Sequence, residues 1–546
     1  MKETLFLKPK FTQEEKYLIE PFFTNLDKSI YAILFLPPEM VGALCSKTSR
    51  SKGDLREIFL SEFVKPFLNT SFGKAFKNFV DFLHKNSYET LFANPKAREF
   101  YFKWLAQYGD DSIAQISGFH LVFSSLSQIA IKHVENQRIG IAPIEKSTRY
   151  VDFSLKVKNH YLYFTPPEIK KMGLEKQYEK VMDNLFETYR FLYQKYFDFL
   201  RKKFPKEKEI VLKTKAFDVA RLILPLSTLG QVAVFGNAQA FEYLINRSLN
   251  HILEEIKWLG KRVFEELNKI APAFLRRVEK KETKEYQRYL GERTKRVREV
   301  IKENKIEENI KKENRYQVKL LEYDPLGEEK IIASLLYPET KLSFEKILEK
   351  VKKLSALQKE KILAKILKDR KFRWYKVPRA FESVYLRFEI LLNIGAWRDL
   401  QRHRMQTQFH QKFNINEGFD VPQDLREIKQ EKRFILAINN LEKLYLKIKD
   451  KEVAQYAVSF AHFVRFIQFQ NLRQFFWESE LRTSSQGHPD YRKVEKEKIK
   501  ILQKIYPLIS KYLLADLKDY QFPRRESIKS EKEKIKDLEK ILKNKK

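Results

Sequence analysis

Three neighbouring side chains, Arg402, His403 and Arg404, form a basic triplet beside a hydrophobic segment. Like charges this close repel one another, and holding an arginine in one rotamer costs conformational entropy. The surrounding stretch DLQRHRMQTQFHQK contains a single acidic residue, Asp399. The triplet is therefore either solvated surface or a site for an anion, which guanidinium groups bind through paired hydrogen bonds.

A second group of polar residues lies in the stretch RIGIAPIEKSTRYVDF. Glu145, Ser147 and Arg149 alternate there, so in an extended backbone their side chains lie on one face. A hydroxyl and a guanidinium on one face can bind a phosphate, and the carboxylate can accept hydrogen bonds from a sugar hydroxyl or a base N–H. The alternative, a surface strand with an internal Glu–Arg pair, stays open.

A third group lies in NLRQFFWESELR and the SSQGHPDYR that follows it. Arg473 and Trp477 are four residues apart and share one face if the segment is helical. Each arginine taken singly is explained by a solvated helix face or a salt bridge to a nearby glutamate. Their number beside aromatic residues favours a flat anionic ligand, with contributions from Asn471, Arg473, Arg482, His488 and Arg492.

Other common chemistries find no support in the sequence. It contains no G-x-G-x-x-G, Walker A, H-E-x-x-H or G-x-S-x-G motif. Phosphate recognition must then use Arg, Lys, Ser and helix N-termini. The nine histidines are scattered and Cys45 is the only cysteine, which excludes a disulfide within the chain and a multi-cysteine metal site. We expect no metal site.

Composition narrows the class of protein further. The chain has 546 residues, of which 43% are hydrophobic and only 15 are glycine, so we expect at least two helix-rich domains. The net charge of +34 favours polyanionic or phosphorylated partners, although an organism-wide lysine bias explains it equally well. Nucleic acid is possible but not favoured. The sequence has no signal peptide pattern and no apolar run of about 18 residues, so we expect a cytoplasmic protein without a membrane span.

The two halves of the chain share a pattern. Residues 218–241 and 452–475 both read as an acidic residue, Val-Ala, an apolar helix and then Asn-x-polar. The spacing from Arg221 to Asn237 equals that from Gln455 to Asn471, at 16 positions (237 − 221 and 471 − 455). We predict an internal duplication with an α+β, helix-rich fold of two tandem units. The predicted segments are a first unit with an N-terminal extension at 1–278, a charged helical connector at 279–315, a second unit at 316–525 and a basic tail at 526–546.

These motifs, in this order, resemble the flavin-dependent thymidylate synthases. That family is identified by an Arg-His-Arg triplet, a following Ser and Arg-Tyr, an Ala-Arg-x-x-Leu-Pro helix, an Asn-x-Arg and a Leu-Arg. The second half of this chain has the triplet and NLR…LR, but Lys412 stands at the serine position. The first half keeps Ser147 and Arg149 and the stretch ARLILP, but has Asn-Gln-Arg at residues 136–138. The stretch SKTSRS resembles the family's flavin-site loop, with Ser49 in the matching place.

The resemblance implies conversion of dUMP to dTMP, with methylenetetrahydrofolate as carbon donor, FAD as cofactor and NADPH as reductant. It implies that FAD is bound by Ser49, Arg402, His403, Arg404, Asn471 and Arg473. It implies that dUMP is bound by Glu145, Ser147, Arg149 and Arg221. Arg482 would be the catalytic residue that polarises the uracil.

Each half keeps a complementary subset of these residues. We therefore expect a composite site in which Ser147 and Arg149 face the same cavity as Arg402, Arg404 and Arg482. The site forms either within one chain or across a homodimer, which would contain four family-like units. Because neither half is complete, a catalytically degenerate nucleotide or nucleic-acid binding protein is the alternative.

Overall fold

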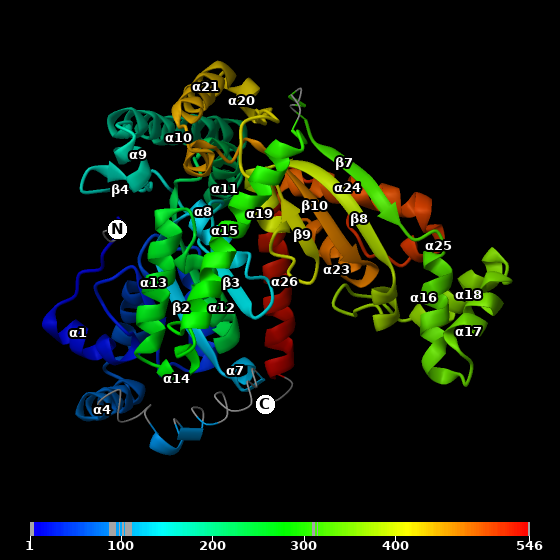
Figure 1. Ribbon diagram of the computed structural model, residues 1–546, viewed down its shortest axis with the longest axis horizontal. Helices are drawn as coiled ribbons and strands as arrows, with labels where there is room; N and C mark the ends of the chain where they lie inside the picture. Colours follow the sequence, from blue (N-terminus) through cyan, green and yellow to red (C-terminus); the bar gives the residue numbers. More distant parts are fainter. Residues whose placement is uncertain are drawn as a thin grey trace. The chain divides into compact units, whose positions relative to one another are not determined.

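The computed structural model describes residues 5–86, 94–97, 99, 100, 103, 112–307, 312, 313 and 315–543. Its contacts divide the chain into two compact units (Figure 1). Unit 1 comprises Met1–Leu192, Ile223–Ile310 and Lys432–Ser459, and unit 2 comprises Tyr193–Leu222, Lys311–Glu431 and Phe460–Lys546. Helices predominate in both units and each contains a four-stranded antiparallel sheet, which confirms the predicted helix-rich α+β class.

The sheet of unit 1 has the strand order β1-β2-β6-β3. Apolar residues pair across its centre, where Val122 lies opposite Ala233 and Phe123 lies opposite Val232, and all four are buried. Helices α7 (Ser112–Ile116), α8, α12 and α13 contact the sheet. The bounds are β1 (Ile30–Ile33), β2 (Gly118–Ser127), β3 (Ile141–Glu145), β6 (Leu229–Asn237), α8 (Gln128–Glu135), α12 (Ala238–Leu249) and α13 (Glu254–Asn268).

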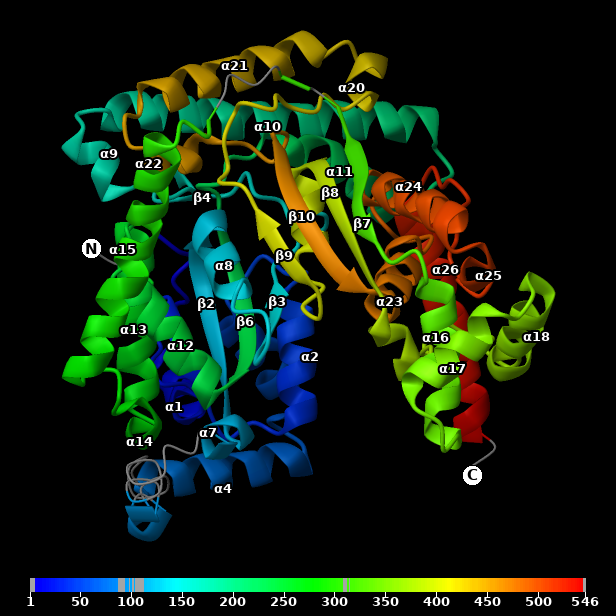
Figure 2. The same cartoon turned by 45° about the vertical axis from the view of Figure 1, so that its right-hand side comes forward.

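The sheet of unit 2 has the order β7-β8-β10-β9, and Figure 2 shows these strands side by side. Its core is formed by apolar residues such as Phe388, Ile390 and Phe466, all of them buried. The bounds are β7 (Gln317–Tyr323), β8 (Tyr385–Asn393), β9 (Thr407–His410), β10 (Phe463–Asn471), α19 (Ile394–Leu400), α23 (Leu472–Arg482) and α24 (Pro489–Ile505).

The two sheets have the same topology, which confirms the predicted duplication. In unit 1, Asn237 ends β6 and its Oδ1 accepts a hydrogen bond of 2.8 Å from the N–H of Ala240, capping α12. In unit 2, Asn471 ends β10 and its Oδ1 accepts one of 2.8 Å from the N–H of Gln474, capping α23. An asparagine that stops a strand and caps the next helix satisfies N–H groups that the first turn leaves without partners.

The predicted apolar helices at 218–241 and 452–475 are wrong in their central parts. Those parts are strands β6 and β10, each preceded by a short 3₁₀ turn that begins at Arg221 in one case and Gln455 in the other. Both strands are inner strands, paired on two sides. Strand β6 (LGQVAVFGN) is buried along most of its length, whereas β10 (FVRFIQFQN) alternates buried with half-buried residues. A short apolar run of this kind does not distinguish strand from helix.

The units do not follow the predicted division at 1–278 and 316–525. Residues 193–222 of the first half belong to unit 2, and residues 432–459 of the second half belong to unit 1. Helix α10 (Glu175–Lys203) runs without interruption through the point at which the assignment changes. The duplicated sequences have thus exchanged a helical segment, and each unit is built from both halves of the chain.

The connector and the tail are both helical. The connector contains α15 (Lys281–Glu303), which packs on α12, and Gln287 on α15 donates a hydrogen bond of 2.9 Å to Asn246. The tail contains α26 (Pro523–Lys543), which packs on α11 (Glu209–Ala220) within unit 2. Among the described residues, every helix is either too short or too polar to span a lipid bilayer.

A buried lysine lies at the centre of unit 2. Lys498 on α24 is fully buried, and its Nζ lies 2.9 Å from Glu495 Oε1, 3.0 Å from Gln468 Oε1 and 3.7 Å from Glu478 Oε2. Burial raises the pKa of Glu478 to about 7, and Lys498 opposes that shift. Two carboxylates in the core therefore depend on one ammonium group for compensation.

The substitution Lys498→Met should lower the free energy of unfolding by about 3–5 kcal/mol, because it leaves two buried carboxylates without their cation. Chemical denaturation followed by circular dichroism measures this. The matched control is Lys500→Met on the same helix, where Lys500 and Glu497 form an exposed pair 2.7 Å apart. That change should cost less than about 1 kcal/mol. Equal losses in the two variants would contradict the central role of Lys498.

Candidate anion-binding site

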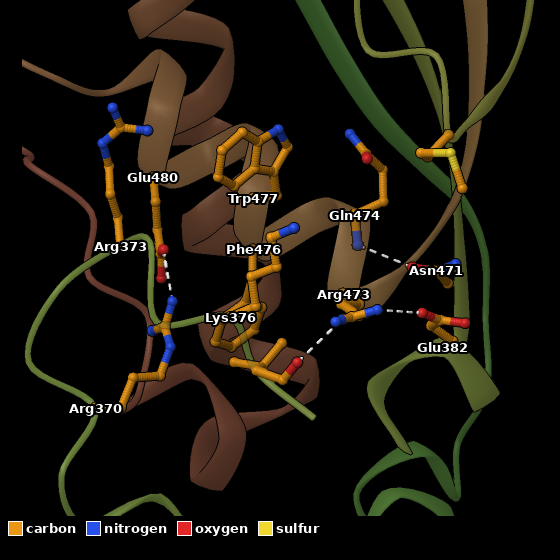
Figure 3. A pocket seen from close by; sticks show the side chains of 12 residues that line it. Arg370, Arg373, Lys376, Glu382, Asn471, Arg473, Gln474, Phe476, Trp477 and Glu480 are labelled. Carbon is orange, nitrogen blue, oxygen red and sulfur yellow. Dashed lines mark hydrogen bonds and ion pairs between the residues drawn. The ribbon is translucent and has the colours of Figure 1, made fainter. Parts of the chain in front are cut away.

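A pocket of about 220 Å³ lies at the start of α23 in unit 2 (Figure 3). Four basic and two acidic side chains line it, which gives a formal excess of two positive charges. Aromatic and amide side chains complete the wall. The lining residues are Arg370, Arg373, Lys376, Val377, Glu382, Met405, Asn471, Arg473, Gln474, Phe476, Trp477 and Glu480.

Two of the four cations are paired with the two carboxylates. Arg370 Nη2 lies 2.7 Å from Glu480 Oε2, and Arg473 Nη1 lies 2.6 Å from Glu382 Oε1 (Figure 3). Arg370 is buried and also donates to the carbonyl oxygens of Tyr375 and Tyr512, at 2.6 and 2.8 Å. These bonds fix the backbone of the segment that follows Arg370, and with it the position of the remaining cations.

The other two cations, Arg373 and Lys376, lie beside an aromatic ring. The guanidinium carbon of Arg373 is 5.8 Å and Lys376 Nζ is 5.9 Å from the centre of the Trp477 ring. The indole is 38% exposed, so one part of it remains accessible beside the two charges. Cations placed next to an accessible ring suit a ligand that combines an anionic group with a flat aromatic system.

The predicted sharing of a face by Arg473 and Trp477 is confirmed, since both line this pocket. Asn471 also lines it, with its side-chain oxygen committed to the helix cap. Arg473 donates a second hydrogen bond of 3.0 Å from Nε to the carbonyl oxygen of Val377. The arginine therefore ties the start of α23 to the segment that carries Lys376.

The basic triplet forms a turn between α19 and β9. Arg402 and Arg404 are half-buried, His403 is buried, and the next residue, Met405, lines the pocket. The structure thus brings the segment that follows the triplet and the Asn-Leu-Arg segment to the same pocket of unit 2.

His403 was expected to bind a cofactor, and its side chain is instead bonded within the protein. Its Nε2 accepts a hydrogen bond of 2.8 Å from Arg482 Nε, and its Nδ1 lies 3.2 Å from the side-chain amide of Gln474. Burial holds the pKa of His403 well below its usual value, and the charges of Arg482 and Lys498 lower it further. The ring is therefore neutral, as an acceptor from a guanidinium must be.

Arg482 is largely enclosed by the same turn. Besides the bond to His403, its Nη2 donates to the carbonyl oxygen of Asp399, and its Nη1 lies 3.5 Å from the Asp399 carboxylate. Its guanidinium also lies 5.4 Å from the centre of the Tyr491 ring. These contacts fasten the triplet turn to the last turn of α23, so Arg482 positions Arg402 and Arg404.

In unit 1 the structure brings Ser49 and Ser147 together. The N–H of Ser147 donates a hydrogen bond of 2.9 Å to the carbonyl oxygen of Ser49, which lies at the end of α2 (Pro38–Thr48). The Oγ of Ser147 accepts one of 3.2 Å from the N–H of Arg149. Both serines belong to predicted phosphate- or flavin-binding stretches that are separated by nearly a hundred residues in sequence.

The predicted common face of Glu145, Ser147 and Arg149 is wrong. Strand β3 ends at Glu145, and the following residues form a turn in which the N–H of Val151 donates to the carbonyl oxygen of Ser147 at 3.1 Å. Glu145 is buried, and its Oε2 accepts a hydrogen bond of 3.0 Å from Lys132 Nζ. Its carboxylate therefore compensates a buried ammonium group.

Arg221 lies in a different unit from the other predicted substrate residues. It belongs to the exchanged segment 193–222 of unit 2, where it is buried and its Nη2 donates a hydrogen bond of 3.3 Å to the carbonyl oxygen of Gly395. Ser147 and Arg149 belong to unit 1. The composite site that includes Arg402, Arg404 and Arg482 stays a prediction.

The stretch RKFRWYK at residues 370–376 supplies three of the four pocket cations and was not among the predicted site residues. Its alternation of cations with aromatic residues was the available signal. Within the described part of the chain, no group of three or more His, Cys, Asp or Glu side chains is arranged to hold a metal ion.

Comparison with known proteins places these features in context. The sequence matches the family described as thymidylate synthase complementing protein over residues 70–273 and 319–508. A UPF0159 protein of Chlamydia muridarum (strain MoPn / Nigg) is 32% identical over 517 residues, covering 92% of this chain and 95% of the relative. A UPF0159 protein of Chlamydia pneumoniae is 33% identical over 513 residues, covering 91% and 94%. A solved UMP/dUMP methylase from Streptomyces cacaoi, bound with 5-Br dUMP, aligns with 37% of this chain and 96% of its own at 16% identity and a TM-score of 0.30.

The neutral state of His403 predicts a pH dependence of stability. The unfolded chain takes up a proton on this histidine below about pH 6.5, and the folded chain does not, so stability holds above that pH and falls below it. The loss is at most about 1.4 kcal/mol per pH unit. His403→Gln keeps an acceptor for Arg482 but does not titrate. The difference in unfolding free energy between the two proteins, measured by denaturant titration, should be constant above about pH 7 and should shift in favour of the variant below about pH 6.5. Parallel curves down to about pH 5 would contradict a neutral, buried His403.

Proposed function

The chain belongs to the thymidylate synthase complementing protein family, and on that premise we propose that it is a flavin-dependent thymidylate synthase that converts dUMP to dTMP. The observation that carries the proposal is the unit 2 pocket, where the Asn-Leu-Arg segment of α23 meets an excess of two positive charges and the Trp477 ring. Such a pocket suits a nucleotide cofactor.

The residues of the pocket fit part of FAD. The cations match a pyrophosphate and the indole matches a flat ring, while the volume of about 220 Å³ suits a phosphate-bearing portion and not the whole dinucleotide. We propose that Arg373, Lys376 and Arg473 bind the cofactor together with Arg402, Arg404 and Asn471, and that Ser49 contributes as the resemblance implies. When bound and reduced, FAD supplies the hydride for the reaction, with NADPH as its reductant and methylenetetrahydrofolate as the carbon donor.

The protein's own contribution to the chemistry is electrostatic. Carbon 5 of uracil is a poor nucleophile, and a cation at the pyrimidine carbonyl stabilises the negative charge that develops when it reacts. Arg482 remains the proposed residue for this role. The contact of Nη1 with the Asp399 carboxylate is 3.5 Å long, whereas the bond from Nε to His403 is 2.8 Å long. A substrate carbonyl would therefore displace the Asp399 contact of Nη1 more readily than the His403 bond of Nε.

We propose that Ser147, Arg149 and Arg221 bind the phosphate and sugar of dUMP. Glu145 is left out, because its carboxylate already compensates Lys132 in the core. A homodimer is part of the proposal, since two duplicated chains supply four family-like units. Sedimentation equilibrium measures the oligomeric state directly.

Nucleotide or nucleic-acid binding without catalysis is the second candidate. The rings of Phe372 and Trp374 stack with centres 4.5 Å apart at an interplanar angle of 6°, and they are 45% and 61% exposed. Lys371 and Lys376, both exposed, flank them. Exposed rings between cations are typical of surfaces that bind single-stranded nucleic acid.

Purified protein supplied with FAD, dUMP, methylenetetrahydrofolate and NADPH should form dTMP, detected by liquid chromatography and mass spectrometry. It should also show flavin absorbance after gel filtration, because the pocket cations retain the cofactor. A colourless protein that forms no dTMP and binds single-stranded DNA in a strongly salt-dependent manner would reject the enzyme and support the second candidate.

The substitution Arg402→Ala should weaken FAD binding by about 1.5–3 kcal/mol, the usual cost of losing a charge-assisted hydrogen bond. Fluorescence titration of the flavin measures the change, and the melting temperature should move little. Arg296→Ala is the matched control, because Arg296 pairs with Glu292 on the exposed surface of α15. Unchanged flavin occupancy together with a large drop in melting temperature would assign Arg402 a structural role instead.

A further inference from the structure

Unit 1 contains a second pocket at the position that corresponds to the anion-binding pocket of unit 2. It lies at the start of α12, and its volume is about 600 Å³. Asn237, Gln239 and Tyr243 line it, each 234 positions before Asn471, Arg473 and Trp477 (471 − 237, 473 − 239, 477 − 243). The duplication has therefore produced two pockets from one ancestral arrangement, and their linings can be compared residue by residue.

The pocket of unit 1 has lost the positive charge of its counterpart. Where unit 2 has Arg473, unit 1 has Gln239. A single ion pair lines the unit 1 pocket among the described residues: Arg277 Nε lies 3.0 Å from Glu242 Oε1, and Arg277 Nη2 lies 2.6 Å from Glu242 Oε2. This bidentate pair neutralises itself, so the formal charge of the lining is zero, compared with an excess of two positive charges in unit 2.

Amide groups replace the charges. Gln115 Nε2 donates a hydrogen bond of 3.0 Å to Gln239 Oε1, and Asn246 Oδ1 accepts one of 2.9 Å from Gln287 Nε2. Gln137 also lines the pocket. It corresponds to His403 when Asn-Gln-Arg at residues 136–138 is aligned with the triplet at residues 402–404, an offset of 266 positions (402 − 136 and 403 − 137). An amide carries both donors and an acceptor, so these side chains can complement a ligand edge on which donors and acceptors alternate.

Apolar and aromatic surface remains accessible beside the amides. Tyr243 and Tyr286 are each 41% exposed, and Ile139 is 58% exposed. All three line the pocket. Partly exposed rings on a cavity wall offer faces on which a flat ligand can stack, at the position where unit 2 presents Trp477.

The rim of this pocket is tightly built. Gly140 has φ = +87°, and a Cβ there would lie 2.7 Å from the Cβ of Ala240. Its carbonyl oxygen accepts a hydrogen bond of 3.0 Å from the N–H of Asn237. Any larger residue at this position would push the turn away from α12. The close packing of the turn on α12 is thus kept, although the pocket has lost its excess of positive charge.

We infer that the unit 1 pocket binds an uncharged, flat ligand with an amide-type hydrogen-bonding edge, of the class of free nucleobases and nucleosides. Its volume of about 600 Å³ lies in the usual range for small-molecule sites. The amides read the edge of the ring, Tyr243 and Tyr286 stack on its face, and the absence of excess charge disfavours phosphorylated ligands. The two copies of the pocket thus select ligands of different charge, anionic in unit 2 and uncharged in unit 1.

Isothermal titration of the full-length protein with thymidine, uridine and adenosine, and with their monophosphates, tests this inference. A nucleoside should bind with an affinity that changes little between low and high salt. Tyr243→Ala should weaken that binding by about tenfold or more, the effect of losing one base–aromatic stack. Trp477→Ala, the equivalent change in unit 2, is the matched control and should leave nucleoside binding unchanged.

A reciprocal substitution sharpens the test. Gln239→Arg restores the residue type found at Arg473 and should shift the preference of the unit 1 pocket from the nucleoside to its monophosphate. Nucleoside binding that is insensitive to Tyr243→Ala, or that is lost in Trp477→Ala instead, would overturn the inference. So would the absence of nucleoside binding in a protein whose melting temperature is normal. Formation of dTMP, assayed in parallel, reports on the proposed enzyme separately.

Discussion

The cap that Asn471 places on α23 is the constraint on which the unit 2 site depends. By accepting the N–H of Gln474 at 2.8 Å, Asn471 ends β10 and starts the helix within one residue. The phase of the helix is thereby fixed, so Arg473 and Trp477 face the pocket in successive turns. Arg482, in the last turn of the same helix, reaches His403 at 2.8 Å and holds the triplet turn in place. One side-chain hydrogen bond thus sets the direction of every residue that α23 contributes.

Charge in this protein is divided between residues that hold the structure and residues that remain available. Arg370 is enclosed by a glutamate and carbonyl oxygen partners, so its charge is compensated within the protein. Arg482 is held through Nε by His403 and through Nη2 by the Asp399 carbonyl oxygen, while its Nη1 makes a longer contact of 3.5 Å with the Asp399 carboxylate. Their bonds fix segments that present other cations, such as Arg373 and Lys376, to the pocket. Because long basic side chains lose entropy when they are held, anchoring the backbone around them lowers the cost of binding an anion.

The sequence predicted the features that depend on local spacing. The equal intervals before Asn237 and Asn471 revealed the duplication, and the four-residue interval of Arg473 and Trp477 placed both on one helix face. Features set by tertiary contacts were not predictable in this way. The position of Arg370 depends on Glu480 and Tyr512, more than a hundred residues away, and the burial of His403 depends on helices that the triplet does not indicate. The exchange of helical segments, which assigns Arg221 to unit 2, leaves no local pattern at all.

The duplication explains why each half of the chain carries an incomplete set of motifs. Both units keep the parts that determine the backbone. These are the strand order, the asparagine that ends β6 or β10 and caps the next helix, and the turn that packs against that helix. They differ in the side chains that line the pocket at the helix start, where arginine and tryptophan in unit 2 correspond to glutamine and tyrosine in unit 1. Pocket-lining positions carry little of the core packing, so they can change without loss of the fold. A change of pocket-lining side chains is therefore the change that a duplicated chain can make at the smallest cost in stability, and it accounts for motifs that are incomplete in each half while the fold is kept.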